Sequence, residues 1–162
     1  MYDGSICHLI ESAIGEHAKR GLIAIVGEET VVTYAEFNTM LASYRSGFRS
    51  WTVDRGTIVA FSCSKRPQSV AAFFGAMAAG LCPVMVDTKL SHEAVSDQIS
   101  TIGIRHLVTD NSTNVAGDTR RLLQVHKLDS LKRSGSANSL AVKLSGEDRA
   151  MALFTSGSTG HP

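Results

Sequence analysis

Candidate chemistry is concentrated in one segment of the sequence, the run Thr155-Ser156-Gly157-Ser158-Thr159-Gly160. Glycines leave backbone N–H groups uncovered, so several of them can turn toward one concave site that suits phosphate oxygens. The hydroxyl side chains add further hydrogen-bond donors. The same residue types are also common in unstructured tails, so the composition of the segment leaves both interpretations open.

An apolar run upstream favours a phosphate loop over a tail. Residues 151–154 (Met-Ala-Leu-Phe) predict a short buried strand that leads directly into the segment, as phosphate loops in α/β proteins commonly require. The spacing of Gly157 and Gly160 is not that of a Walker A loop, and no Lys follows. A dinucleotide fingerprint would need three glycines that open a helix. The sequence therefore predicts a phosphate site of another kind.

The elements that must position this loop alternate between helix and strand. Helical spacing, caps and Pro67 predict helices over residues 5–19, 33–51, 67–79 and 91–102, the second of them opened by a Thr33/Glu36 capping box. Short β-rich runs predict strands over residues 22–26, 30–32, 57–62, 82–86, 105–109 and 122–125. Because strands joined by helices require right-handed crossovers, the predicted fold class is α/β, with a mainly parallel sheet and helices on both faces.

The faces of the helices can be read from the same spacing. The first helix is expected to bury Ile6, Leu9, Ile10, Ala13 and Ile14, with Glu11, Glu16 and Lys19 largely on its opposite side. The second helix is expected to bury Phe37, Leu41, Tyr44, Phe48 and Trp51, and the last one Val95, Ile99 and Ile102.

Composition limits the classes of function. The chain has 162 residues, 43% of them hydrophobic, and a net charge of +1, which suits one globular domain with a core of its own. Basic residues are not clustered or interleaved with aromatic residues, so no nucleic-acid partner is expected. The charge-free stretch 70–86 is interrupted by Gly80 and Pro83, and it predicts a buried helix followed by a strand rather than a transmembrane segment.

Cysteine usage and the N-terminus indicate a cytoplasmic protein. Cys7, Cys63 and Cys82 are far apart and lie in apolar contexts, so we expect small buried side chains rather than metal ligands. The first four residues contain an acid and no basic segment, and they do not resemble a secretory signal.

Other candidate sites are weaker. Ser62 and Ser64 flank Cys63 after a predicted strand, but the Gly-x-Ser-x-Gly elbow of a nucleophile is missing. Lys132 and Arg133 lie in a predicted loop, where we expect two solvated charges. The histidines are scattered without the helical spacing of a zinc site, so we expect surface or boundary residues rather than ligands at His8, His17, His92, His106, His126 and His161.

Three motifs resemble those of the adenylate-forming superfamily. Thr155 to Gly160, with Pro162, resembles its Thr-Ser-Gly-Ser-Thr-Gly-x-Pro-Lys-Gly signature. The run Val32-Thr33-Tyr34-Ala35-Glu36-Phe37 is similar to its Thr-Tyr-x-Glu-Leu motif. Residues 78–87 resemble its Ala-Gly-x-x-x-Val-Pro-Leu-Asp segment, with the proline displaced. The motifs follow one another in the family's order over essentially the whole chain, which is therefore identified as a member.

This resemblance implies an ATP-dependent acid–thiol ligase. In such enzymes a carboxylate attacks the α-phosphate of ATP to give an acyl-adenylate and pyrophosphate, and a thiol of CoA or of a carrier protein then displaces AMP. By this resemblance Thr155, Ser156, Gly157, Ser158, Thr159 and Gly160 would hold the β- and γ-phosphates, and ATP and Mg²⁺ would be the cofactors. Phe154 and His161 look more like acyl-CoA synthetases of fatty acid metabolism than like peptide-synthetase adenylation domains, which remain the alternative subfamily.

The departures from the family pattern concern the end of the chain. The Lys-Gly that completes the signature is missing, and the family's adenine contacts, magnesium ligand and catalytic lysine lie farther downstream. We therefore expect residues 1–162 to form a single α/β subdomain that ends within the phosphate loop of a larger N-terminal domain. We expect it to contain no catalytic residue or metal ligand and to be inactive alone, with residues 156–162 mobile. A non-catalytic binding module and a subunit of a split enzyme are the alternatives.

Overall fold

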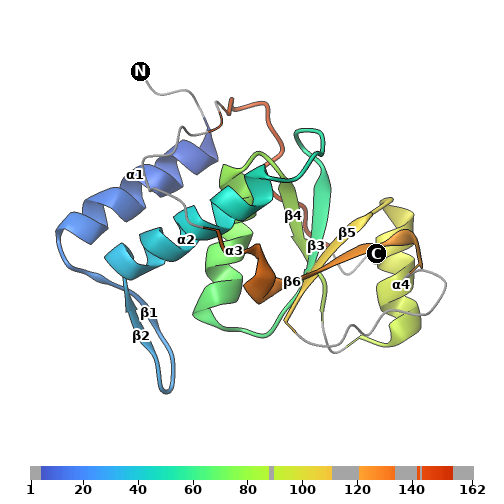
Figure 1. The fold of residues 1–162 in the computed structure, drawn as a ribbon, viewed down its shortest axis with the longest axis horizontal. Helices are drawn as coiled ribbons and strands as arrows, with labels where there is room; N and C mark the ends of the chain where they lie inside the picture. Colours follow the sequence, from blue (N-terminus) through green and yellow to red (C-terminus); the bar gives the residue numbers. More distant parts are fainter. Residues whose placement is uncertain (1–4, 88–89, 111–120, 134–141, 143, 155–162) are drawn as a thin grey trace.

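The computed structural model describes residues 5–87, 90–110, 121–133, 142 and 144–154, and Figure 1 shows their arrangement. The elements follow in the order α1 (Ile6–Lys19), β1 (Ile23–Val26), β2 (Val31–Thr33), α2 (Tyr34–Arg49), β3 (Ile58–Ser62), α3 (Pro67–Ala78), β4 (Cys82–Met85), α4 (His92–Thr101), β5 (His106–Thr109), β6 (Gln124–Lys127) and the 3₁₀ helix η1 (Leu128–Leu131). This order confirms the predicted alternation of helix and strand.

The centre of the fold is a four-stranded sheet in the order β4-β3-β5-β6, in which all neighbouring strands are parallel. In this register Ala60 of β3 lies between Val84 of β4 and Leu107 of β5. Strands β1 and β2 form a separate antiparallel hairpin beside the helices. The predicted α/β class with a parallel sheet is confirmed.

Helices cover both faces of the sheet, as predicted, and each face has its own core (Figure 1). On one face, here called the α2/α3 face, Val59, Phe61 and Val108 pack against aromatic and small side chains of α2 and α3, and α1 packs on α2. On the opposite face, here called the α4 face, Ala60, Val84 and Leu107 pack with Val95 and Ile99 of α4. Successive strand residues alternate between the two cores because side chains on a strand point to opposite faces.

Local signals in the sequence set the ends of several helices. The Thr33 hydroxyl accepts a hydrogen bond from the Glu36 N–H, and the Glu36 carboxylate accepts one from the Thr33 N–H, which completes the predicted capping box of α2. Pro67 is the first residue of α3, as predicted, and Gly80, with a φ of 86°, turns the chain from α3 toward β4. The stretch expected to be a buried helix followed by a strand is therefore confirmed as α3 and β4.

The first helix buries a narrower stripe than expected. Cys7 and Ile14 are buried and Ile10 packs against the core, as i, i+3, i+7 spacing requires. The prediction was wrong for three residues that are exposed instead, namely Ile6, Leu9 and Ala13. The stripe passes through Cys7, whose small side chain brings α1 close to Met77 of α3.

An ion pair between α1 and α2 explains why Glu11 faces α2. Arg45 of α2, with a side chain only 5% exposed, donates to the Glu11 carboxylate at 2.6 Å. The sequence placed Glu11 on the outer face of α1, and the structure shows instead that it faces α2. A buried guanidinium requires such a partner, because an uncompensated charge in the interior is costly.

The prediction that Ile102 is buried was also wrong, because it follows the end of α4 and is exposed. The other boundaries differ from prediction by small shifts. Strand β6 begins two residues later than expected, because Leu122 lies in a helical turn and pairing starts where the Gln124 N–H donates to the Arg105 carbonyl. The predicted buried strand 151–154 is reduced to one parallel bridge between Ala152 and Val84, and Met151 and Leu153 are exposed. The 3₁₀ helix η1 was not predicted at all.

The described parts of the chain contain no helix that is both long and apolar enough to span a membrane. The three cysteines are buried, as the sequence predicted.

Candidate functional site

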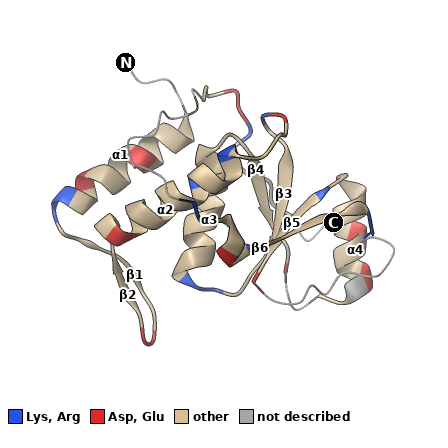
Figure 2. Cartoon of the chain, viewed as in Figure 1, with Lys and Arg blue, Asp and Glu red and all other residues tan. Residues whose placement is uncertain are grey.

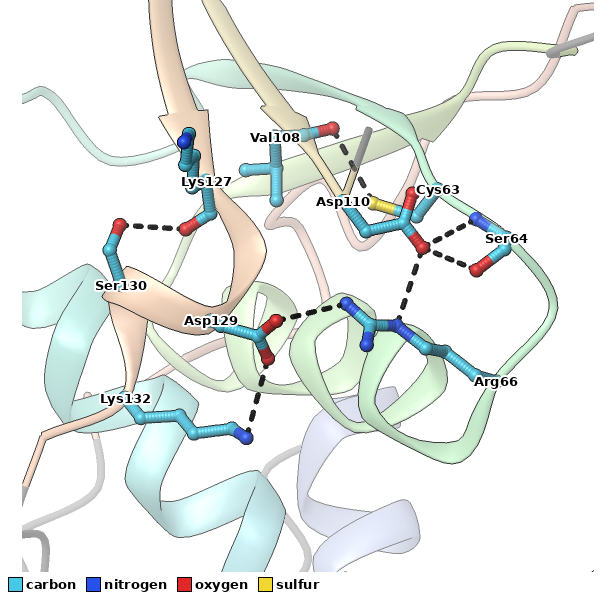
Figure 3. A network of polar contacts seen from close by, with 9 residues as sticks. All are labelled: Cys63, Ser64, Arg66, Val108, Asp110, Lys127, Asp129, Ser130 and Lys132. Carbon is cyan, nitrogen blue, oxygen red and sulfur yellow. Dashed lines mark hydrogen bonds and ion pairs between the residues drawn. The ribbon is translucent and has the colours of Figure 1, made fainter. Parts of the chain in front are cut away.

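Polar side chains gather where the parallel strands end. Ser64 follows β3, Asp110 follows β5 and Asp129 follows β6, and all three lie at the carboxyl edge of the sheet (Figure 3). In open α/β sheets this edge is where ligands usually bind. Strands β3, β4 and β5 carry no charged residue along their length, so the charges lie at their ends and on the helices (Figure 2).

Asp110 is the buried acid of this edge. Its carboxylate accepts hydrogen bonds from the Ser64 hydroxyl and, at 3.0 Å, from the Ser64 N–H, and Arg66 Nε lies 3.3 Å from the same oxygen. The Asp110 side chain is only 5% exposed, and this burial raises its pKa. The two Ser64 hydrogen bonds and Arg66 together outweigh burial, so the pKa of Asp110 lies below its ordinary value. Asp110 is therefore ionised at neutral pH and fixes Arg66 at the start of α3.

Arg66 connects the ends of three strands. Its Nη2 lies 3.3 Å from Asp129 Oδ2, and Lys132 Nζ lies 3.4 Å from the other carboxylate oxygen. Lys132 also lies over the ring of the buried Tyr44, 5.9 Å from its centroid. The prediction that Lys132 is merely solvated was wrong, since it belongs to this network, and the Arg133 guanidinium donates to the Ser130 carbonyl at 3.2 Å.

A groove lies beside this network, with a volume of about 620 Å³. This size is typical of sites for small molecules. The hairpin β1–β2 forms one wall, and the end of β3 with the first turns of α3 forms the other. The lining is mostly apolar, with Lys65 and Arg66 as cations and Glu28 as an acid, and consists of Ile25, Val26, Gly27, Glu28, Thr30, Phe61, Cys63, Ser64, Lys65, Arg66, Pro67, Ser69, Val70, Phe73 and Met85.

Cys63 lines the groove but is not suited to act as a nucleophile. Burial raises the pKa of its thiol to about 12, and the nearby carboxylate of Asp110 acts in the same direction. The thiol donates to the Val108 carbonyl at 3.5 Å, which holds it toward the sheet. Because the thiolate is the reactive form, Cys63 is an inert side chain of the core edge. Ser64 likewise uses its hydroxyl to hold Asp110.

The six residues of the predicted phosphate loop, Thr155, Ser156, Gly157, Ser158, Thr159 and Gly160, lie outside the described residues. The structure does describe the approach to them. The Ala152 N–H donates to the Pro83 carbonyl at 3.0 Å, and Ala152 forms a parallel bridge with Val84. Ala152 and Phe154 pack against the core of the α4 face. Since the bridge is parallel and Phe154 follows Ala152 by two residues, the chain at Phe154 has reached the carboxyl end of β4. The polar network lies at this same carboxyl edge of the sheet.

No metal centre is formed by the described residues, in which His, Cys, Asp and Glu side chains do not gather in groups of three or more. The expectation of surface or boundary positions was wrong for His106, which is buried and lies beside a second histidine. His106 Nδ1 and His126 Nε2 lie 3.4 Å apart on the neighbouring strands β5 and β6. Twenty residues separate them in the sequence, so only knowledge of the strand register could have predicted this contact.

Comparisons with known proteins agree with this architecture. A family model described as AMP-binding enzyme matches residues 13–162. Nonribosomal peptide synthetase agiA of Aspergillus flavus is 29% identical over 150 residues, which cover 86% of this chain and 2% of that protein. The 3-hydroxybenzoate–CoA ligase of Aromatoleum sp. (strain CIB) is 29% identical over 170 residues, which cover 94% of this chain and 32% of that ligase.

Solved structures show the same fold. The N-terminal subdomain of NpsA from Klebsiella oxytoca superimposes with a TM-score of 0.80 at 24% identity, over 94% of this chain and 40% of that chain. The o-succinylbenzoate CoA synthetase MenE from Bacillus subtilis, in complex with its acyl-adenylate intermediate, gives a TM-score of 0.69 at 24% identity, over 92% of this chain and 40% of that chain. The chain thus spans less than half the length of these relatives.

Proposed function

Because the chain belongs to the family of AMP-binding enzymes, whose model matches residues 13–162, we propose that it serves the activation of a carboxylate with ATP. In this proposal residues 155–160 bind the β- and γ-phosphates. The main support for this proposal is the parallel bridge of Ala152 with Val84. The bridge brings the chain to the carboxyl end of β4 immediately before the glycine- and hydroxyl-rich segment, and ligands of open α/β sheets usually bind at this edge.

The chemistry of the segment suits the leaving group of the reaction. When a carboxylate attacks the α-phosphate, negative charge grows on the departing pyrophosphate. Backbone N–H groups freed by Gly157 and Gly160, with hydroxyls of Thr155, Ser156, Ser158 and Thr159, would stabilise this charge more in the transition state than in bound ATP. Mg²⁺ would enter on the phosphates and neutralise part of their charge. No described residue is assigned as its ligand.

For the second half-reaction we propose transfer of the acyl group to a thiol, and CoA as the acceptor. The matched ligase from Aromatoleum is named for CoA and for 3-hydroxybenzoate. Phe154 before the loop also resembles acyl-CoA synthetases more than peptide-synthetase domains. A carrier protein is the second candidate acceptor, because the match to a peptide synthetase has the same identity. The NpsA subdomain was solved with 3-hydroxybenzoyl-AMSN, so aromatic acids belong in any substrate panel beside fatty acids.

The proposal is tested by calorimetric titration of the 162-residue protein with pyrophosphate in the presence of Mg²⁺. We expect weak binding that the double substitution Ser156→Ala with Thr159→Ala reduces by about tenfold or more, because each hydrogen bond to a charged group contributes about 1.5–3 kcal/mol. The control Ser12→Ala removes an exposed hydroxyl from α1, away from the carboxyl edge of the sheet, and should leave the affinity unchanged. Equal affinities for all three proteins, or no binding, would refute the phosphate loop.

We further propose that these 162 residues alone do not form adenylates. They span 32% of the matched CoA ligase, and the family's catalytic lysine has no counterpart in the sequence motifs recognised in this chain. An ATP–pyrophosphate exchange assay with aromatic and fatty acids should give no turnover above a blank. Robust exchange with any acid would overturn this part of the proposal.

A further inference from the structure

Three aromatic side chains, His106, His126 and Trp51, pack together at β6, the last strand of the described sheet. His106 Nδ1 and His126 Nε2 lie 3.4 Å apart, and the two imidazole planes make an angle of only 20°. The rings therefore lie edge to edge in nearly one plane. The indole of Trp51 stacks on this plane, with centroid distances of 4.0 Å to His126 and 5.1 Å to His106.

The surroundings of the pair keep it neutral near pH 7. His106 is 8% exposed, and burial lowers the pKa of both rings, with the charge of His106 as a second cause at His126. The charged groups next to the pair in sequence are Arg105 and Lys127, beside His106 and His126. Arg49, Asp54 and Arg55 line a cavity together with Trp51. None of these five is a cause of either shift.

The two rings bind two protons in a defined order. In the neutral pair one ring donates its N–H and the other accepts with a lone pair. A first proton from water binds the outer nitrogen of the donor ring and leaves the shared hydrogen bond intact. A second proton occupies the acceptor nitrogen, so two N–H donors with two positive charges face each other. The hydrogen bond is then lost and the rings repel.

We propose that His106, His126 and Trp51 form a proton-operated latch that holds edge strand β6 on the sheet and releases it when both rings are protonated. The proposed latch does not depend on the proposed binding of ATP phosphates. The stability that the latch contributes is present above the ordinary histidine pKa of about 6.5 and is lost as the pH falls through the lower values of the folded state.

The latch acts on the polar network because β6 continues directly into η1. His126 lies three residues before Asp129, which pairs with Arg66, while Leu128 and Leu131 of η1 are buried in the core of the α2/α3 face. Release of β6 therefore loosens the segment that carries Asp129 and weakens its ion pair with Arg66 at the carboxyl edge of the sheet. Protonation of the two histidines is thus coupled to an ion pair at the candidate site.

The fluorescence of Trp51 reports on the latch directly, because it is the single tryptophan of the chain. Titration from about pH 8 to about pH 4 should give two steps about one unit or more apart, the coupled behaviour of interacting sites. His126→Gln should leave one step, closer to the ordinary histidine value. The control His8→Gln, on the exposed side of α1, should reproduce the two steps of the wild type.

Two measurements on the wild-type protein need no variant. Imidazole ¹⁵N shifts should show one tautomeric N–H between the rings at neutral pH and two macroscopic titration steps. Amide hydrogen exchange, corrected for its intrinsic pH dependence, should rise in β6 and η1 below the second step and stay constant in α4. The proposal is overturned if the two rings titrate independently, or if exchange in β6 and η1 does not respond when both rings are charged.

Discussion

The two faces of the parallel sheet are covered in different ways. On the α2/α3 face three helices enclose a core that contains Tyr44, Phe48 and Phe61, all fully or almost fully buried. On the α4 face the described residues contribute a single helix and a smaller aliphatic core. The approach to the candidate phosphate loop, Ala152 and Phe154, packs on this second face. The larger core thus lies on the α2/α3 face, whereas the residues that lead to the proposed phosphate loop pack on the α4 face.

The largest effect should come from Ile99→Ala, which removes the most deeply buried side chain of α4 at a cost of about 2–5 kcal/mol. Because α4 has few other contacts with the described residues, we expect hydrogen exchange to rise in α4 and at Ala152 while α2 stays protected. The matched variant Leu41→Ala, on α2, should instead destabilise the whole fold. Identical exchange profiles for the two variants would show that the faces are not separable.

A second test concerns the close packing of the α2/α3 face. A Cβ added at Gly47 would lie 1.7 Å from the backbone oxygen of Leu131, so Gly47→Ala must push η1 away. We expect a loss of about 3 kcal/mol or more in the free energy of unfolding, measured with urea. The control Gly15→Ala, on α1, meets no atom within 4 Å and should stabilise the protein by up to about 1 kcal/mol. A neutral Gly47→Ala would contradict the described packing.

The capping box of α2 should have a smaller effect. Thr33→Ala removes the acceptor for the Glu36 N–H and should lower the stability by about 0.5–2 kcal/mol, whereas Thr33→Ser keeps the acceptor and most of the stability. Thermal unfolding monitored by circular dichroism measures both. If serine were as harmful as alanine, the threonine methyl group rather than the hydrogen bond would be responsible.

The smallest expected effect is electrostatic, at the carboxyl edge. Ser64→Ala removes the hydroxyl hydrogen bond to Asp110 and keeps the backbone one, so the pKa of that carboxyl should rise toward its ordinary value. An acid with a lowered pKa stabilises the fold above its unfolded pKa, and this contribution is lost as the pH falls through the folded value. The variant should therefore lose less stability on acidification than the wild type. Carboxyl ¹³C shifts follow the titration, and an unchanged Asp110 pKa would count against the network.

The sequence predicted the fold better than it predicted the contacts of the site. The capping box, Pro67 and Gly80 act over a few residues, so α2, α3 and β4 could be located by pattern alone. The sequence places strand β6 two residues too early because the apolar signal lies at Leu122 and Leu123, ahead of the paired residues. The 3₁₀ helix η1 had no local signal, because it depends on Leu128 fitting a distant core. The pairing of Arg66 with Asp129 and of His106 with His126 depends on strand order, which a linear pattern does not contain.

The central claim is that the chain leads from the α4 face into a phosphate-binding loop at residues 155–160. It is tested most directly by backbone amide NMR of the 162-residue protein during titration with pyrophosphate and Mg²⁺. The account predicts progressive shifts of the amides of residues 155–160, with smaller shifts at Ala152 and Phe154 and none in α1. Shifts confined to Lys65 and Arg66 at the groove, or no shifts in residues 155–160, would contradict it.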